Sequence, residues 1–271
     1  NVLYRERYDE LSDYVARNLQ AKTTLESYNP ESLIQCDTFE VIDHVFIKWI
    51  TERLLNEDLG AKLSGKSLSE ICKDRRKRHF GDRYRSEYHM LESASYVIAA
   101  ASYQSRDDLK DIVKQYTTND YQIDQQYRKF YYNYDQFNEN SHFEKIRDLV
   151  ENIYTNEFLS KNVYNWNVGL KKADLSSSMP LQRIFYSKYI QSSKDRVVVI
   201  ISDAMRYDVG QSLFVKLEDD EKCTPKLESL MSTLPSYTRL GMGALLPHKS
   251  LELTQDNKVL VDGMPCDSLK Q

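Results

Sequence analysis

The chain has 271 residues, 41% of them hydrophobic, and a formal net charge of -4 at pH 7. This length is enough for one large domain or two smaller ones, each with its own hydrophobic core. The acidic balance argues against a grip on nucleic acid along the whole chain, but it leaves room for a local basic patch. No run approaches the roughly 20 apolar residues that span a bilayer, which excludes a transmembrane helix.

The first residue and the cysteines bear on two points: whether the chain is a piece of a longer protein, and in which compartment it is found. The first residue is Asn1, and no signal sequence precedes the first predicted helix. The cysteines are few and show no CxxC spacing, which is typical of reduced thiols; they are Cys36, Cys72, Cys223 and Cys266. We therefore expect a cytoplasmic piece of a longer protein.

The first two thirds of the sequence are predicted to be helical. Apolar residues recur at three- and four-residue steps along 37–55, where Asp37 and Glu40 have the spacing of a capping box. Ser67 and Glu70 have the same spacing ahead of a second helix. Further helices are predicted over 4–19, 68–78, 84–101, 109–116, 123–134, 142–159 and 180–190.

The pattern changes after residue 192. Residues 197–201 form a continuous β-branched run, which predicts a strand covered on both faces. A helix over 207–217 and a short helix opening at Thr224 are expected to follow. Two more strands are predicted over 231–234 and 258–261, the latter ending at Asp262 and Gly263.

The predicted fold class is a mainly α N-terminal region followed by the incomplete start of an α/β domain. We place the boundary so that residues 1–193 form the helical domain and residues 194–271 form the opening of the α/β domain. Open α/β sheets usually contain about five or more strands, whereas this part supplies three candidates. The partner strands are expected beyond Gln271 or in another chain.

Asp203 follows the first predicted strand, at the edge where open α/β sheets place their functional loops. A carboxylate is costly to bury there unless it is paired, hydrogen-bonded or bound to a metal. Zinc and hard divalent cations both accept such a ligand. Capping of the next helix, a phosphoaspartyl enzyme and a nucleotide-binding sheet are alternatives that this stretch leaves open.

A hydroxyl follows at the next predicted strand end. Thr238 opens a predicted helix, whose positive N-terminal end favours a developing negative charge. Ser236 is the second candidate nucleophile, and ordinary N-capping is the alternative for both residues. The order of an acid and then a hydroxyl 35 positions later is more informative than either residue alone.

The sequence around these residues resembles a PglZ domain, a branch of the alkaline phosphatase superfamily found in BREX phage-defence systems. The similarity rests on "VVVIISDAMRYD", "CTPKLESLMSTLPSYTRLGMGALLPH" and "VLVDG". The stretches "DTFEVIDHVFIKWI", "RRKRHFGDRYRSEY" and "QRIFY" resemble the helical region that precedes the PglZ domain. The resemblance therefore covers most of the chain.

The resemblance implies a site with two divalent metal ions, zinc first, with manganese or magnesium as alternatives. By this resemblance Asp203 is a metal ligand and Thr238 is the nucleophile that bridges both ions. Two ions would lower the pKa of the hydroxyl and stabilise the attacking and leaving oxygens. The family's remaining Asp and His ligands come from later strands, so we expect this chain alone to be inactive. His248 is a lone histidine in this part of the chain and is expected to be structural.

Basic residues supply further candidates. Arg206 and Arg239 lie close in sequence to the two key positions and could clamp a phosphate, although an ion pair is the alternative for each. Asp208 is expected to be a negative charge in the first turn of its helix. The run "KDRRKRHF" at 73–80 could contact nucleic acid or an acidic protein, or could be a solvated helix end.

Three functions compete. The first is a metal-dependent phosphoesterase of a phage-defence assembly, with DNA or another nucleic-acid phosphodiester as a candidate substrate. The second is a scaffold with a vestigial site that docks other BREX components, BrxB or a methyltransferase by family resemblance. A nucleotide-binding module is the weakest, because no glycine-rich phosphate loop follows the strand at 197–201.

Overall fold

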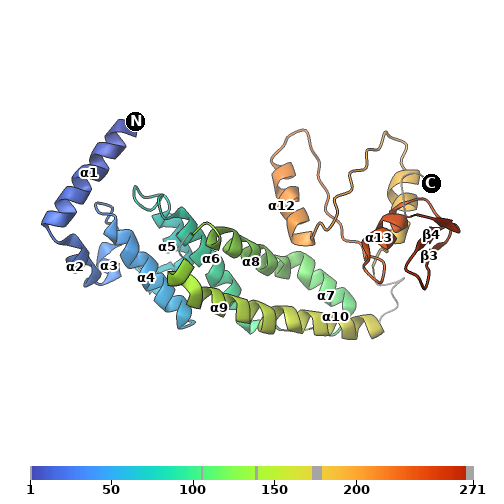
Figure 1. The fold of residues 1–271 in the computed structure, drawn as a ribbon, viewed down its shortest axis with the longest axis horizontal. Helices are drawn as coiled ribbons and strands as arrows, with labels where there is room; N and C mark the ends of the chain where they lie inside the picture. Colours follow the sequence, from blue (N-terminus) through green and yellow to red (C-terminus); the bar gives the residue numbers. More distant parts are fainter. Residues whose placement is uncertain (1, 105, 138–139, 173–178, 267–271) are drawn as a thin grey trace. The chain divides into compact units, whose positions relative to one another are not determined.

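The computed structural model describes residues 2–104, 106–137, 140–172 and 179–266. The protein is mostly helical and divides into two compact units (Figure 1). The first unit comprises Asn1–Ser105 and Gln122–Val163, and the second comprises Arg106–Tyr121 and Tyr164–Gln271. The second unit therefore includes residues upstream of the boundary predicted at 193/194. No helix in the described ranges is both long and apolar enough to cross a membrane.

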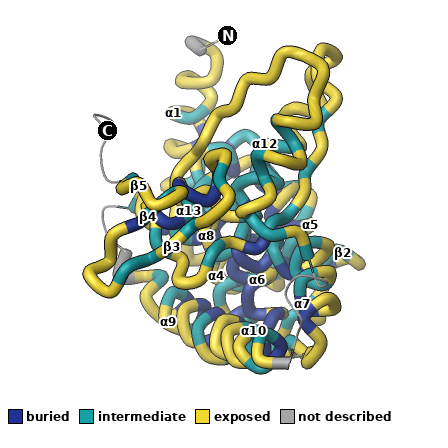
Figure 2. The backbone as a smooth tube through the Cα atoms, turned by 90° about the vertical axis from the view of Figure 1, so that its right-hand side faces the viewer, coloured by how far each residue is buried: buried dark blue, intermediate teal, exposed yellow. Residues whose placement is uncertain are grey.

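The first unit is built from helices that, apart from α1, contribute apolar side chains to one core. Its helices are α1 (Val2–Asn18), α2 (Ala21–Glu26), α3 (Pro30–Leu33), α4 (Val41–Leu55), α5 (Leu68–Arg75), α6 (Arg85–Ala99), α8 (Tyr121–Tyr134) and α9 (Glu144–Asn152). A short hairpin, β1 (Lys62–Leu63) and β2 (Lys66–Ser67), leads into α5. Helix α6 packs against α4, α5 and α9. Phe46, Leu91 and Phe130 are among the fully buried side chains of this core. Figure 2 shows buried backbone along α4 and α6.

One of the two predicted capping boxes is confirmed. At α5, the Ser67 hydroxyl accepts from the Glu70 backbone N–H, while the Glu70 carboxylate accepts from the Ser67 backbone. The box predicted for Asp37 and Glu40 is wrong, since α4 begins after Glu40 without a side-chain cap. Both carboxylates make tertiary contacts instead: Asp37 accepts from the backbone N–H of His79, and Glu40 accepts from the hydroxyl of Tyr84.

The helices predicted over 109–116 and 123–134 are joined rather than separated. A π-helical stretch, Tyr116–Asp120, connects α7 (Leu109–Gln115) directly to α8. The hydroxyls of Thr117 and Thr118 donate to backbone carbonyls three and four residues earlier, which locally perturbs the helical hydrogen-bond ladder. A second π-helical stretch, Ile153–Leu159, joins α9 to α10 (Ser160–Lys172), so the helix predicted to end at residue 159 continues.

The second unit holds the part predicted to be α/β. A 3-10 turn (Gln182–Ile184) and a π-helical stretch (Tyr186–Gln191) take the place of the regular helix predicted over 180–190. Helices α12 (Tyr207–Glu218) and α13 (Thr238–Leu245) confirm two predicted helices. Strands β3 (Leu251–Leu253), β4 (Val259–Val261) and β5 (Met264–Pro265) form an antiparallel sheet. The turn after β4 contains Asp262 and Gly263, as predicted.

Three predicted elements of this unit are wrong. Residues 197–201 are not a strand, and their side chains are 41% to 88% exposed rather than buried. Residues 231–234 contribute only an isolated parallel bridge between Leu181 and Met231. No helix opens at Thr224. A strand needs a neighbour for its N–H and C=O groups, and none of the described segments pairs with 197–201.

Candidate functional site

Asp203 lies in an exposed turn ahead of α12. Its Oδ1 accepts a 2.9 Å hydrogen bond from the backbone N–H of Ala204, whose φ of 53° is in the left-handed region. That conformation costs a non-glycine residue about 1–2 kcal/mol. The N-cap of α12 is Arg206, so Asp203 does not cap the helix. The helix-cap alternative for this carboxylate is therefore excluded.

Thr238 is the first residue of α13 and is exposed. The N-cap position belongs to Tyr237, whose side chain makes no capping hydrogen bond. The Thr238 hydroxyl has no hydrogen-bond partner within the described ranges, and Ser236 is exposed as well. N-capping is thus not the role of either hydroxyl. A hydroxyl at this end of a helix lies where the peptide dipoles favour negative charge.

Helix α13 is held in place from two sides. Gln182 donates from Nε2 to the carbonyl of Gly241 at 3.2 Å and accepts from the N–H of Thr233 at its Oε1, also at 3.2 Å. On another face, Gly243 lies so close to β3 and β4 that an added Cβ would approach the side chain of Leu251 to 3.1 Å. Sequence reasoning missed Gln182, whose only signal was its place in the "QRIFY" stretch.

A cavity of about 620 Å³ lies beside α13. It is lined by Leu181, Gln182, Arg183, Met231, Ser232, Thr233, Leu234, Leu240, His248, Lys249, Leu251 and Leu253. The Nδ1 of His248 lies 2.7 Å from the carbonyl oxygen of Leu246. Because a carbonyl oxygen only accepts, Nδ1 is the donor of this hydrogen bond. Neither Asp203 nor Thr238 lines this cavity.

The two candidate phosphate-binding arginines, Arg206 and Arg239, are both exposed. Arg206 donates from Nε to Oδ1 of Asp208 at 3.0 Å, and the carboxylate of Asp208 is fully buried while the Arg206 side chain is 52% exposed. Asp208 lies in the first turn of α12, where a negative charge is favourable, as predicted. Arg206 thus has the ion pair that was the alternative to phosphate binding. Arg239 follows Thr238 and is exposed.

The described residues do not by themselves form a metal site. No group of three or more His, Cys, Asp or Glu side chains among them is arranged to hold an ion. Divalent metals in proteins usually take three or more protein ligands, or a few carboxylates completed by water and substrate. No hydrogen bond or ion pair within the described ranges joins Asp203 to Thr238. Asp203 supplies one donor of the right chemistry, and one donor does not fix the position of an ion.

Comparisons with known proteins show what the chain is similar to. Residues 185–271 match the family model of the BREX system PglZ alkaline phosphatase-like domain. The "alkaline phosphatase-like protein PglZ" of Bacillus cereus (strain H3081.97) is 33% identical over 274 residues, which cover 96% of this chain and 31% of that protein. The "alkaline phosphatase-like protein BrxZ" of Escherichia coli O9:H4 (strain HS) is 28% identical over 290 residues, covering 95% and 32%.

These matches confirm the resemblance to PglZ that was inferred from the sequence motifs. The similarity extends through the helical region as well as the PglZ domain. The chain spans about a third of the length of these curated relatives. No solved structure matches it significantly.

Proposed function

We propose that this chain, which is related to PglZ and BrxZ over most of its length, is part of a metal-dependent phosphoesterase of a BREX phage-defence system. The observation that supports the proposal most is the match of residues 185–271 to an alkaline phosphatase-like domain. Asp203 and Thr238 lie within that match, and neither is used as a helix cap. Both side chains are exposed, which leaves them accessible to a ligand.

In this proposal each residue of the site has one role. Asp203 offers its carboxylate as a metal ligand, and Thr238 attacks phosphorus with its hydroxyl oxygen. Arg239 contacts phosphate oxygens, which a guanidinium meets with paired N–H donors, and Arg206 is the second candidate, whose guanidinium would be shared between the phosphate and Asp208. Two divalent ions, zinc first and manganese or magnesium as alternatives, would supply charge stabilisation when bound. The N-terminus of α13 favours the negative charge that develops on attack.

The whole protein, rather than the 271 residues alone, is proposed to carry the activity. The described residues contain no group of three ligand side chains, and the relatives are about three times longer. We propose a domain boundary at 193/194, close to where the family match starts. The candidate partners are other BREX components, BrxB or a methyltransferase, and DNA or another nucleic-acid phosphodiester is the candidate substrate. A cytoplasmic location stays a prediction from the cysteine pattern.

The metal content of the whole protein tests the role of Asp203. Elemental analysis by mass spectrometry is compared between the parent, Asp203→Ala and the control Asp195→Ala, which removes another exposed carboxylate from the same unit. Asp203→Ala is expected to lose one bound ion or both, while Asp195→Ala keeps the parental content. Equal metal content in all three proteins would exclude Asp203 as a ligand.

The identity of the nucleophile is tested by comparing the activities of Thr238→Ala and Ser236→Ala. Thr238→Ala is expected to abolish phosphodiester hydrolysis, because no other hydroxyl starts α13. Ser236→Ala, two positions earlier, is expected to keep most of the activity. The opposite result would transfer the nucleophile role to Ser236.

The alternative function is a scaffold whose site is vestigial. It is favoured by exposed apolar side chains on α1, where Tyr4 is 72%, Leu11 60% and Tyr14 61% exposed, as on a surface that a partner covers. Phage restriction by the whole protein separates the two functions. Under the enzymatic proposal, Asp203→Ala and Thr238→Ala lose defence; undiminished defence with either variant would favour the scaffold.

A further inference from the structure

The basic run at 73–80 has two parts with different surroundings. Its first half is used inside the helical unit: Arg75 is buried and pairs with Asp43, and Arg76 pairs with Glu92 at 2.5 Å. The second half lies in the turn after α5. Lys77 is exposed, and neither Lys77 nor Arg78 forms an ion pair with any described residue. The run is therefore more than a solvated helix end.

Lys77 and Arg78 belong to a groove between α1 and the turn after α5. The groove has a volume of about 730 Å³ and is lined by Tyr4, Arg5, Tyr8, Arg76, Lys77, Arg78, His79, Asp82 and Arg85. Five cationic side chains thus face one carboxylate. When Glu92, the partner of Arg76, is included, three positive charges remain in excess. This local charge is opposite to the net charge of -4 on the chain.

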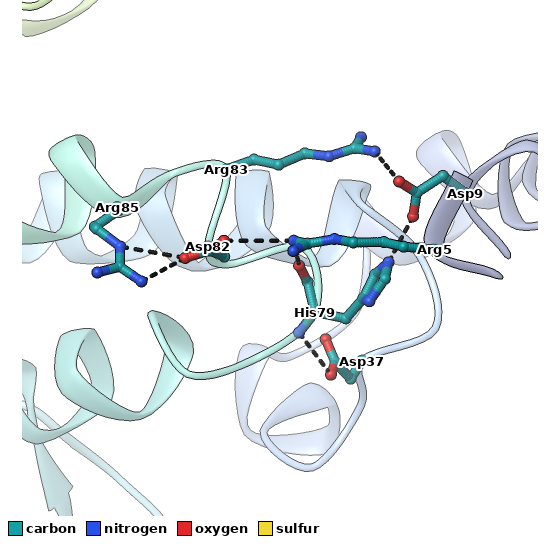
Figure 3. Close-up of polar contacts among 7 residues, drawn as sticks. All are labelled: Arg5, Asp9, Asp37, His79, Asp82, Arg83 and Arg85. Carbon is teal, nitrogen blue, oxygen red and sulfur yellow. Dashed lines mark hydrogen bonds and ion pairs between the residues drawn. The ribbon is translucent and has the colours of Figure 1, made fainter. Parts of the chain in front are cut away.

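Ion pairs hold the two walls of the groove together (Figure 3). Asp82 accepts from Arg5 of α1 at 3.4 Å and from Arg85 of α6 at 2.5 Å. Asp9 of α1 accepts from Nε2 of His79 at 2.5 Å and pairs with Arg83. The pKa of Asp82 is lowered chiefly by the hydrogen bond and charge of Arg85, with a smaller effect of Arg5. Asp82, which lines the groove, and Asp9, which lies beside it, are thus both paired with cationic side chains rather than isolated acids that would repel an anion.

Two tyrosines give the groove an aromatic wall. Tyr4 and Tyr8 lie one helical turn apart on α1, with 72% and 42% of their surfaces exposed. The ring of Tyr8 is fixed by an edge contact with His79, whose ring centroid lies 4.8 Å away. An exposed aromatic ring beside cations can stack on a nucleobase while the cations meet the phosphates.

We propose that this groove binds single-stranded nucleic acid. The excess positive charge suits a phosphate backbone, and the exposed tyrosines suit unpaired bases, which offer their faces for stacking. An acidic protein segment would use the cations but has no need of the aromatic rings. Base-paired DNA would likewise meet the cations alone, because its bases are already stacked. The groove lies in the helical unit, and its proposed role does not depend on the phosphoesterase proposal.

The charge requirement is tested by equilibrium binding of a fluorescein-labelled 20-mer of deoxythymidine to the protein. Fluorescence anisotropy is recorded in EDTA, so that no metal-dependent reaction contributes. Lys77→Glu/Arg78→Glu is compared with Arg7→Glu/Lys22→Glu, which changes the net charge equally with exposed cations outside the groove. The groove variant is expected to bind about tenfold or more weakly and to reduce the slope of log K against log salt by about 1–2. The control is expected to bind within about twofold of the parent, since it removes no phosphate contact.

The stacking requirement is tested with Tyr4→Ala. Tyr14→Ala is the control, because Tyr14 is similarly exposed on α1 but does not line the groove. Tyr4→Ala is expected to weaken single-strand binding by about fivefold or more, as loss of one stacked base would. Binding of a 20-base-pair duplex should be unchanged by Tyr4→Ala. Circular dichroism of each variant verifies that the helices are intact.

Three outcomes would overturn the proposal. The first is parental binding by the Lys77 and Arg78 double variant, and the second is an equal loss in the control variants. The third is failure of the parent to bind the oligonucleotide at 50 mM salt while it binds polyglutamate through Lys77 and Arg78. That last result would assign the groove to an acidic protein. None of these outcomes bears on hydrolysis, so the phosphoesterase proposal stands or falls separately.

Discussion

At the residue scale, a buried network of polar side chains lies in the core of the helical unit. Arg75 donates from Nε and Nη2 to the two oxygens of Asp43 at 2.9 and 2.8 Å, and from Nη1 to the carbonyl of Cys36 at 2.8 Å. The hydroxyl of Tyr88 donates to the same carboxylate at 2.6 Å. Arg75 is 2% exposed and Asp43 is fully buried. The sequence indicates Arg75 only as one charge in a basic run, because a linear pattern does not reveal which cation meets a buried acid.

Removal of Asp43 is expected to destabilise the protein strongly. Asp43→Ala would leave the Arg75 guanidinium buried without its counter-charge, which costs about 3–5 kcal/mol in the free energy of unfolding. The control is Asp58→Ala, which breaks the exposed Arg53–Asp58 pair at 3.5 Å and should cost about 0–1 kcal/mol. Urea unfolding followed by circular dichroism measures both. Similar losses in the two variants would show that the buried network contributes no more than a surface pair.

The cysteines are expected to react at very different rates. Burial raises the pKa of the Cys72 thiol to about 12, whereas Cys223 is exposed. The thiolate is the reactive form, so at pH 8 Cys223 is expected to be alkylated by iodoacetamide while Cys72 stays unmodified in the folded protein. Peptide mass spectrometry after timed labelling measures this. Labelling of Cys72 as fast as Cys223 would show that the core around it is open.

At the element scale, the periodic spacing of apolar residues predicts most of the helices. Their ends depend on hydrogen bonds and tertiary contacts that this spacing does not reveal. The helix over 207–217 and the helix opening at Thr238 are confirmed almost to the residue. The π-helical stretches escape prediction because they keep the helical pattern of apolar residues while changing the hydrogen bonding. The strand at 197–201 is predicted from its β-branched residues, yet local propensity is not sufficient without a neighbouring strand.

The turn after α5 is expected to depend on Gly81. A Cβ at this position would lie 1.8 Å from the backbone carbonyl oxygen of Arg75, so the backbone would have to move. Gly81→Ala is therefore expected to lower the free energy of unfolding by about 2 kcal/mol or more, as strain in a packed site does. Gly60→Ala is the control, because nothing lies within 4 Å of its added Cβ. Equal stability of the two variants in urea would contradict this close approach of Gly81 to Arg75.

Residues 197–201 are expected to exchange their amide hydrogens rapidly in the 271-residue chain. Their backbone N–H groups make no hydrogen bond within the described ranges, and exchange is slow only where such bonds protect the amide. Residues 90–94 of α6 serve as the protected reference. Hydrogen exchange with mass spectrometry measures both segments. In the whole protein, we expect protection of 197–201, since the proposed α/β domain would supply neighbouring strands; equally fast exchange there would contradict that domain.

At the scale of the whole molecule, the sequence predicts a helical region followed by the start of a different domain. The helical part is accessible to prediction because its core is made by successive amphipathic helices whose periodicity is visible in the sequence. For the candidate site, the sequence predicts the residues Asp203 and Thr238 but not how they are arranged in space. A metal site requires ligands that converge from several segments, and the described residues offer no such group. Gln182, which positions α13, also acts through distant contacts that no short motif encodes.

In the whole protein, Asp203 and Thr238 are proposed to serve a metal-dependent phosphoesterase. The rate of bis-p-nitrophenyl phosphate hydrolysis by the purified whole protein with Zn²⁺, Mn²⁺ or Mg²⁺ tests this proposal directly. We expect metal-dependent hydrolysis that falls about a hundredfold or more in Asp203→Ala and in Thr238→Ala, with Asp195→Ala unaffected. Hydrolysis at the parental rate by Asp203→Ala, or absence of any metal-dependent hydrolysis by the parent, would contradict it.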